Sequence, residues 1–404
     1  MKYIIVLGDG MADEPLEALG GKTPLMCAKT PVMDMLAEKS DIGLAYTIPE
    51  GMKPGSDVAN LAVLGYYPAE YYSGRSPLEA LSIGVDLKPT DIAMRTNLVT
   101  ISDEPDIPFE ERTILDHSSG EISTEEAAQL IDAVKEAFET DTHHFYVGTS
   151  YRHLLIWEKG EILELDQPHD VLGSKVGPHM PSDPILHDMM KRSFDILDHH
   201  PINLARAAEG KNKANCLWFW GAGTKPALTS FYEKTGKKGT MISAVDLLKG
   251  IAVGAKMDVV EVEGANAQLE TNYEGKAMAA VNALKNGADF AYIHVEAPDE
   301  MGHQGSIEKK IKSIEYIDSR VVKVLMHEME KVGEPYRLLI MPDHPTPIRC
   351  RTHTASPVPF MLYDRFHEQC NKGATYDEAY AAKTGLVVKE GWHTIDLLFG
   401  TQEK

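Results

Sequence analysis

Carboxylates and imidazoles recur in three short segments at spacings that suit a divalent cation. Asp299 and His303 are four residues apart, Asp343 and His344 are adjacent, and His353 lies a little further along the chain. Mixed sets of this kind bind Zn²⁺ or Mn²⁺. Each segment alone has a structural explanation, because an Asp-His pair can form a turn and a histidine can end a loop. Their joint occurrence after apolar runs indicates a metal site.

Two more residues extend this set. Asp9 follows the apolar run 3–7 and precedes a glycine, where it could also be an ordinary turn residue. Ser56 follows Pro54-Gly55, which predicts a turn, and we expect it to be the N-cap of a helix that runs to Leu64. A serine there lies where free N–H groups and the helix dipole favour a phosphate, although capping alone is the structural alternative.

The three aspartates, three histidines and one serine are too many ligands for one such ion and suit two. They converge if the strand ends that precede them lie on one edge of a sheet, where α/β proteins bind ligands. A two-metal site can clamp the entering and leaving oxygens of a phosphoryl group. The residues alone therefore indicate phosphoryl chemistry.

Apolar runs and amphipathic segments alternate along much of the chain, and they must position these residues. We predict strands at 3–7, 94–101, 143–147, 151–157, 216–220, 258–262, 290–295, 337–341 and 359–363, and helices at 31–39, 124–138 and 307–331. The middle helix follows a capping box at 123–126. Apolar strands that alternate with helices imply a mostly parallel sheet covered on both faces.

The histidine-rich middle of the chain has a different, α+β pattern. The fold class predicted is therefore α/β, with a mostly parallel sheet, helices on both faces and a smaller inserted α+β domain. We place the core domain at 1–89 and 205–404 and the inserted domain at 90–204.

Composition narrows the possible partners. The chain has 404 residues and a formal net charge of −21, which argues against nucleic acid as a partner, because nucleic-acid binding depends on clustered Lys and Arg.

No apolar run approaches the roughly 20 residues that cross a bilayer. Four widely spaced cysteines predict neither disulfides nor a thiolate zinc site. We expect a cytoplasmic protein without membrane contact; the sequence predicts no oligomeric state. Residues 20–23 match the last residues of the P-loop motif, but the rest of that motif is absent.

The motifs together resemble those of the cofactor-independent phosphoglycerate mutases of the archaeal type, within the alkaline phosphatase superfamily. The matching stretches run nearly end to end: Gly8-Asp9-Gly10, Pro54-Gly55-Ser56-Asp57, Tyr72-Ser73-Gly74-Arg75, Ala297-Pro298-Asp299 to Gly302-His303, Pro342-Asp343-His344, and His353-Thr354 to Pro357-Val358-Pro359-Phe360. One departure is Pro345, where many relatives in the wider mutase group have glycine after the Asp-His pair.

The resemblance implies a role for each residue. Ser56 is the nucleophile that carries the phosphoryl group, and two divalent ions, Mn²⁺, Mg²⁺ or Zn²⁺, are the cofactors. One ion is held by Asp9, Ser56, Asp343 and His344, and the other by Asp299, His303 and His353. The inserted domain closes over a small phosphorylated substrate, and the predicted substrate-binding residues are Arg75, His117, Arg152, His153 and Lys225.

The implied reaction moves a phosphoryl group between the 2- and 3-hydroxyls of glycerate without 2,3-bisphosphoglycerate. Three alternatives stay open at this stage. The bacterial sequences most like this one have been proposed as homoserine kinases, although we find no P-loop or kinase-like glycine loop. A phosphatase would release phosphate steadily. A metal-binding structural or sensor protein would not turn over at all.

Overall fold

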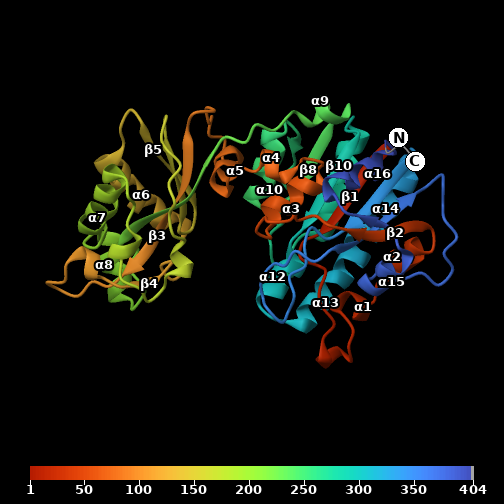
Figure 1. Cartoon of the computed structure of the whole chain (residues 1–404), viewed down its shortest axis with the longest axis horizontal. Helices are drawn as coiled ribbons and strands as arrows, with labels where there is room; N and C mark the ends of the chain where they lie inside the picture. Colours follow the sequence, from red (N-terminus) through yellow and green to blue (C-terminus); the bar gives the residue numbers. More distant parts are fainter. Residues whose placement is uncertain (402–404) are drawn as a thin grey trace. The chain divides into compact units, whose positions relative to one another are not determined.

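The computed structural model describes residues 1–401 and divides into two compact units. The core unit comprises Met1–Tyr72 and the chain from Leu228 onward, and the inserted unit comprises Ser73–Ala227 (Figure 1). The core unit is an α/β structure with a mostly parallel sheet, and the inserted unit is α+β. The predicted fold class is therefore confirmed.

Eight strands form the sheet of the core unit, in the order β13-β2-β12-β11-β1-β10-β8-β9. Among the strands that residues 1–401 form in this sheet, only β12 runs antiparallel to its neighbours. The strands are β1 (Lys2–Gly8), β2 (Ser40–Ala45), β8 (Gly239–Ile242), β9 (Asp258–Val259), β10 (Phe290–Val295), β11 (Tyr336–Met341), β12 (Val358–Asp364) and β13 (Val387–Val388). The central strands are almost wholly apolar because both faces of the sheet are covered.

Helices cover both faces of this sheet (Figure 1). One face packs on α2 (Pro31–Ala37), α11 (Tyr273–Lys285), α13 (Ile307–Tyr316), α14 (Lys323–Val332) and α15 (Glu378–Thr384). On the other lie α3 (Ser56–Val63), α10 (Asp246–Gly254) and α16 (Thr394–Phe399). The remaining helices of this unit are α1 (Pro24–Cys27), α4 (Pro68–Tyr71), α9 (Phe231–Thr235) and α12 (Ala297–His303). The helix predicted at 307–331 is continuous but contains a π-helical segment, Ile317–Val322.

The topology brings the ends of several strands to one edge of the sheet. The chain leaves β1, β2, β10 and β11 at this edge, because these strands are parallel. It enters β12 at the same edge, because β12 is antiparallel to β11. The loops at all five strand ends therefore lie on the same side of the sheet, and each precedes or contains a predicted site residue.

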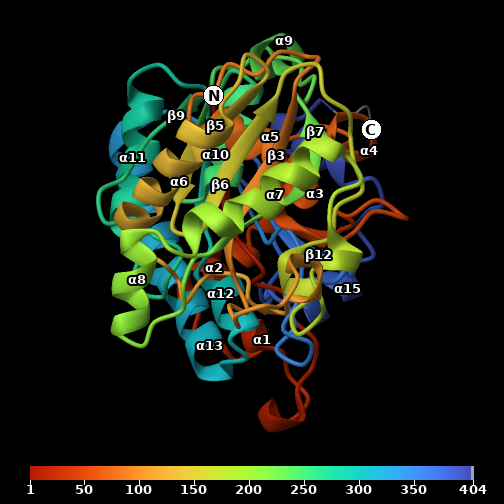
Figure 2. The same ribbon diagram turned by 90° about the vertical axis from the view of Figure 1, so that its left-hand side faces the viewer.

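The inserted unit is built on an antiparallel sheet. Its strands are β3 (Ile92–Ile101), β4 (Ile114–Asp116), β5 (His143–Thr149), β6 (Arg152–Trp157) and β7 (Cys216–Thr224). Helices α6 (Thr124–Phe138) and α7 (Pro184–Leu197) lie over one face (Figure 2), and α8 (Pro201–Ala208) follows α7. On the other face, α5 (Arg75–Ser82) contributes Ala80 to a small apolar cluster. The predicted N-terminal cap by Ser123 is present, since its side chain accepts a hydrogen bond from the Glu126 N–H, while the Glu126 carboxylate accepts one from Arg206.

The inserted unit extends beyond the predicted range 90–204 on both sides. Strand β7, which we assigned to the core sheet, pairs with β3 over most of its length. Helix α5 belongs with these two strands, because the Ser76 hydroxyl donates to the Gly221 carbonyl and accepts from the Arg95 N–H. Apolar patterning predicted the strand correctly but could not show which sheet it joins.

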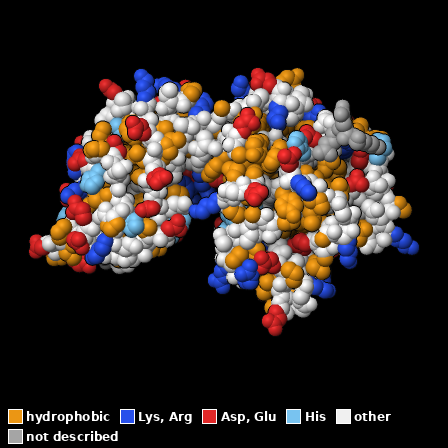
Figure 3. All heavy atoms as spheres, viewed as in Figure 1, with side chains coloured by type: hydrophobic (Ala, Val, Ile, Leu, Met, Phe, Trp, Pro, Cys, Tyr) orange, Lys and Arg blue, Asp and Glu red, His pale blue; other side chains and the backbone are white. Residues whose placement is uncertain are grey.

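The surface mixes side chains of both charges with apolar ones over both units, on the face that Figure 3 shows. Among residues 1–401, no helix combines the length and apolar character needed to span a bilayer.

Candidate active site

Ser56 is the first residue of α3, and its hydroxyl faces the ends of the central strands. The sequence-based assignment of Ser56 as the N-cap is wrong, because Gly55 occupies that position. The Ser56 Oγ instead lies 3.1 Å from His344 Nε2, in the loop after β11. Ser56 is only partly buried. Its hydroxyl therefore faces the candidate ligand His344 and is not the N-cap of the helix.

His344 lies beside this hydroxyl, and the carboxylates of Asp9 and Asp343 lie near the same imidazole nitrogen. His344 Nε2 lies 3.7 Å from Asp9 Oδ1 and 3.5 Å from Asp343 Oδ2. All three side chains are buried, with Asp9 4% exposed and the other two fully enclosed. Asp9 also lies in a turn, so its interpretation as a turn residue and its interpretation as a metal ligand are compatible.

Asp299, His303 and His353 form a second group beside the first. Asp299 Oδ2 lies 3.2 Å from His303 Nε2, and Asp299 Oδ1 lies 3.5 Å from His353 Nε2. The two imidazole Nε2 atoms are 3.0 Å apart. The His344 and His353 rings have centroids 4.0 Å apart, which makes His344 a neighbour of both groups. The structure therefore brings together all seven residues that the sequence predicted as ligands.

Burial and neighbouring charges shift the pKa values of the side chains in these groups. Burial, reinforced by the negative charges of Asp343 and Asp299, raises the pKa of Asp9 well above its ordinary value. Burial also opposes ionisation of Asp299, but hydrogen bonds from His303 and His353 outweigh it and hold its pKa well below the usual range. The hydrogen bond to Asp299 raises the pKa of His303 to about 9.

A divalent cation fits this arrangement. Asp9 Oδ1 is buried, and no described residue supplies it with a hydrogen-bond partner. Buried polar atoms without partners are uncommon in native structures and call for an ion or water. Two sets of three potential ligands lie within 4.8 Å of one another: Asp299, His344 and His353, and Asp9, His294 and Asp343. Carboxylate and imidazole donors of this kind suit Zn²⁺ or Mn²⁺.

Outer groups that the sequence analysis missed hold these ligands in place. Asn60, one turn after Ser56 on α3, donates to the Ser56 carbonyl and to Asp343 Oδ2, both at 2.8 Å. The Thr346 hydroxyl contacts Asp299 Oδ1 and lies 3.4 Å from His344 Nδ1. Such contacts orient metal ligands. Asn60 follows Ser56 by four residues, the spacing of one helical face, and that spacing could have indicated it.

Gly10 is required where the loop after β1 passes α12. Its φ is +59°, and a Cβ atom there would lie 2.6 Å from Asp299 Oδ1 and 2.8 Å from the Asp299 Cα. Any larger residue would push Asp299 away from its partners. The Gly10 N–H also donates to Asp343 Oδ1 at 3.1 Å, so this glycine links the aspartates of two loops.

All five predicted substrate-binding residues lie in the inserted unit. Arg75 is exposed and bonds to Glu79, with Nε and Oε1 3.0 Å apart. Glu79 also pairs with Arg95, a buried arginine that the sequence analysis missed and that stacks over the Trp220 ring at 4.7 Å. Although burial opposes it, the charges of Arg95 and Arg75 hold the pKa of Glu79 below its ordinary value.

The other four residues have differing environments. Arg152 is exposed at the start of β6, with its guanidinium 5.3 Å from the Tyr151 ring centroid, and His117 packs edge-on against the same ring. Lys225 is half-buried just after β7. His153 is only 1% exposed, and its Nδ1 accepts a hydrogen bond from the Gly148 N–H, so it is enclosed in the fold of this unit.

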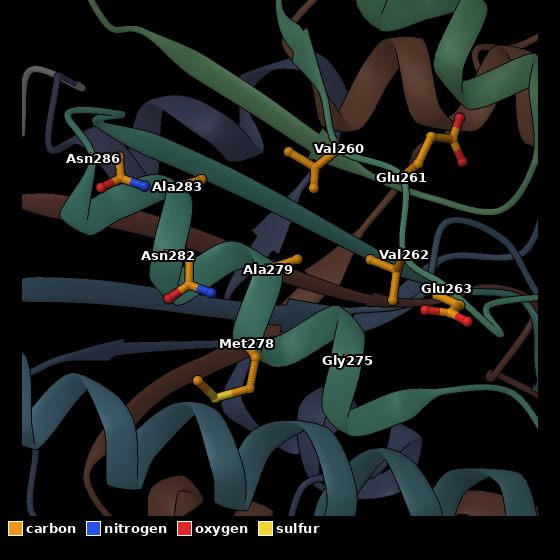
Figure 4. A pocket seen from close by; sticks show the side chains of 10 residues that line it. All are labelled: Val260, Glu261, Val262, Glu263, Gly275, Met278, Ala279, Asn282, Ala283 and Asn286. Atoms are coloured by element: carbon orange, nitrogen blue, oxygen red, sulfur yellow. The ribbon is translucent and has the colours of Figure 1, made fainter.

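A groove with a volume of about 430 Å³ lies elsewhere on the core unit, between α11 and the segment after β9 (Figure 4). Its lining is mostly apolar or amide side chains, with Glu261 and Glu263 on one side. None of the predicted ligands lines it, so the groove is separate from the candidate site.

Fold and site together define an α/β protein with a carboxylate–imidazole centre, suited to divalent cations, at the edge of its main sheet. The comparisons with known proteins identify the family. The sequence profile described as 2,3-bisphosphoglycerate-independent phosphoglycerate mutase matches residues 37–203. A protein of that name from Methanosarcina barkeri is 48% identical, over 98% of this chain and 99% of the relative. The chain belongs to the 2,3-bisphosphoglycerate-independent phosphoglycerate mutase family.

Solved structures agree with this assignment. The PH0037 protein from Pyrococcus horikoshii has a TM-score of 0.83 and 29% identity, and the alignment covers 100% of this chain and 98% of that one. The cofactor-independent phosphoglycerate mutase from Thermoplasma acidophilum has a TM-score of 0.67 and 26% identity, over 99% and 100% of the two chains.

Proposed function

We propose that this chain interconverts 3-phosphoglycerate and 2-phosphoglycerate without 2,3-bisphosphoglycerate, through a phosphoserine at Ser56 and with two divalent cations. The observation that carries the proposal is the position of the Ser56 hydroxyl, 3.1 Å from His344 Nε2, which itself lies 3.5 Å from Asp343 Oδ2 and 3.7 Å from Asp9 Oδ1.

The residues present divide the chemistry among them. Ser56 Oγ gives up its proton and attacks the phosphorus of 3-phosphoglycerate, while the bond to the 3-oxygen breaks and that oxygen takes up a proton. The 2-hydroxyl of the bound glycerate then gives up its proton and attacks the phosphorus, and the bond to Ser56 Oγ breaks and that oxygen is protonated again. The seven predicted ligands would hold the cations, which when bound favour the serine alkoxide and offset charge on the phosphoryl oxygens. The positive end of the α3 dipole acts in the same direction.

Glycerate has to stay bound and turn between the two transfers, and water has to be kept from the phosphoserine. Otherwise the enzyme would be a phosphatase. We assign this task to the inserted unit, which carries Arg75 and Arg152 as exposed cations suited to a carboxylate or phosphate. Its role as a cap over the substrate follows from the resemblance and is part of the proposal.

A coupled assay tests the proposal. Purified chain loaded with Mn²⁺, Mg²⁺ or Zn²⁺ should convert 3-phosphoglycerate to 2-phosphoglycerate with no added 2,3-bisphosphoglycerate. Steady phosphate release in place of the isomer would identify a phosphatase. Turnover of homoserine with ATP, and none of phosphoglycerate, would identify a kinase. No turnover of any of these substrates would overturn the proposed catalytic role.

Metal affinity is expected to rise with pH. The pKa of His303 is about 9 without metal, and a ligating imidazole must be neutral, so binding releases a proton from His303 at lower pH. Apparent affinity should therefore increase by about tenfold per pH unit between pH 7 and 9 and level off above. Calorimetric titration with Mn²⁺ in buffers of different ionisation enthalpy measures the proton release. Affinity that is flat over this range would contradict the role of His303.

A further inference from the structure

We propose that Glu378 is a pH-sensitive clamp on an arm of the core unit, which we define as residues 14–22. The carboxyl group of Glu378 joins the two ends of this arm, and its ionisation favours release of the arm. The inference does not depend on the proposed reaction, because Glu378 and its partners are neither predicted metal ligands nor predicted substrate contacts.

The arm projects from the core unit and has hydrogen bonds of its own. Figures 1 and 2 show it as a red loop that extends away from the sheet and helices of this unit. Leu16 and Lys22 form a bridge, in which the Leu16 N–H donates to the Lys22 carbonyl at 3.0 Å. A Cβ atom on Gly20 or Gly21 would have no described residue beyond its neighbours within 4 Å. The arm therefore depends on its two ends for its place on the unit.

One carboxyl group bonds to both of these ends. Glu378 is the first residue of α15, and its Oε1 accepts a hydrogen bond from the Asp13 N–H at 3.1 Å. Its Oε2 accepts one from the Thr23 hydroxyl at 2.6 Å. A further connection, the ion pair of Glu14 with Arg349, is exposed, and exposed pairs contribute little. Glu378 is thus the group that ties the ends of the arm to each other and to α15.

The surroundings of this carboxyl group oppose its ionisation. Burial raises the pKa of Glu378 to about 7, and the hydrogen bonds from Thr23 and Asp13 offset this rise only in part. Charged groups face it from two elements. Asp377, at the start of α15, raises its pKa further by repulsion, whereas Lys310 on α13, which is paired with Asp13, attracts its negative charge.

The raised pKa determines the direction of the response to pH. The ordinary pKa of a glutamate is about 4.5, so the released carboxyl group holds its proton less tightly than the clamped one. The clamped state is therefore most favoured at low pH, and its advantage falls as the pH rises from about 4.5 to 7. Above this range the group is ionised in both states, and the advantage no longer changes.

Hydrogen–deuterium exchange of the peptide that covers the arm tests the inference. In the full chain saturated with Mn²⁺, and after correction for intrinsic exchange rates, protection should fall by about 30- to 100-fold between pH 5 and 8. Most of this fall should occur below pH 7.5. Glu378→Gln keeps a hydrogen-bonding side chain without the charge, so its protection should not change with pH.

Glu14→Gln is the matched control. It removes the other carboxylate that fastens the arm, and the hydrogen bond from Arg349 holds the pKa of Glu14 below its ordinary value, so Glu14 does not titrate in this range. This variant should retain the wild-type pH dependence. An effect transmitted from the metal centre would persist in Glu378→Gln, so loss of the pH dependence in that variant is specific to Glu378.

Wild-type protection that is constant from pH 5 to 8, or an equal pH dependence in Glu378→Gln, would overturn the inference. If Glu378→Gln does not fold, Thr23→Ala and Thr23→Ser take its place. Thr23→Ala removes the hydroxyl that favours the ionised carboxylate, so the range over which protection falls should extend upward by about one pH unit. Thr23→Ser keeps the hydroxyl and should behave like the wild type. Identical profiles for these two variants would also contradict the clamp.

Discussion

Replacing Ser56 with alanine is expected to lower kcat for phosphoglycerate interconversion by three orders of magnitude or more. The side chain supplies the oxygen that carries the phosphoryl group, and loss of a nucleophile generally removes most of an enzyme's rate enhancement. The Ser56 hydroxyl is not a helix cap, so the change should leave the stability of α3 almost unaffected. Stopped-time assays of 2-phosphoglycerate, with thermal unfolding in parallel, measure both effects.

Ser123→Ala is the matched control for this variant. Ser123 caps α6 in the inserted unit through its bond to the Glu126 N–H, so its loss should cost about 1 kcal/mol of stability. Turnover should be retained. If Ser56→Ala keeps wild-type kcat, then Ser56 is not the nucleophile, whatever its position beside His344.

Replacing Lys310 with methionine is expected to destabilise the core unit by about 3–5 kcal/mol. Lys310 lies on α13 with its side chain fully buried, and its Nζ is 2.8 Å from the equally buried Asp13 Oδ2. The same ammonium group donates to the carbonyls of Ala12 and Thr346. The variant would leave the Asp13 charge buried without its partner, and breaking such a pair costs much more than the pair contributes.

Urea unfolding of the metal-free chain measures this effect apart from metal loss. A double variant, Lys310→Met with Asp13→Asn, should recover part of the stability, because no unpaired charge is left. The control is Lys331→Met, which removes an exposed pair with Glu328 and should change stability by less than about 1 kcal/mol. Similar stabilities for Lys310→Met and Lys331→Met would contradict the account.

Lys310 also connects the stability of the fold to the metal centre. Ala12 follows Asp9 in the loop after β1, and Thr346 follows His344 in the loop after β11. One buried ammonium group therefore joins two ligand-bearing loops to the helix that follows Asp299. Nothing in the sequence around residue 310 distinguishes this lysine from those on an exposed helical face, because its partners come from distant segments.

The clustering of the candidate ligands could be predicted from the sequence for a specific reason. Asp9, Asp299 and the Asp343-His344 pair each follow an apolar run, and parallel strands end on the same edge of a sheet. His353 precedes β12, and it reaches the same edge only because β12 is antiparallel, which patterning alone does not reveal. His294 escaped notice because it lies within an apolar run and not after it.

The boundaries of the inserted unit were harder to predict. Strand β7 is as apolar as the strands of the main sheet, and its pairing with β3 depends on contacts between residues more than a hundred positions apart. The short strands β2 and β8 were missed, because neither segment has an extended apolar run. The role of Asn60 depends on Asp343, in a loop far along the chain, so helical spacing indicates which way it faces but not its partner.

Trapping of the phosphorylated enzyme tests the central claim most directly. Metal-loaded chain mixed with 3-phosphoglycerate labelled with ³²P on the phosphate, and quenched in acid within the first turnovers, should carry the label on the peptide that contains Ser56. Ser56→Ala should carry none. Isomerisation at full rate with no label on this peptide would contradict a phosphoserine intermediate and would require direct transfer or another carrier residue.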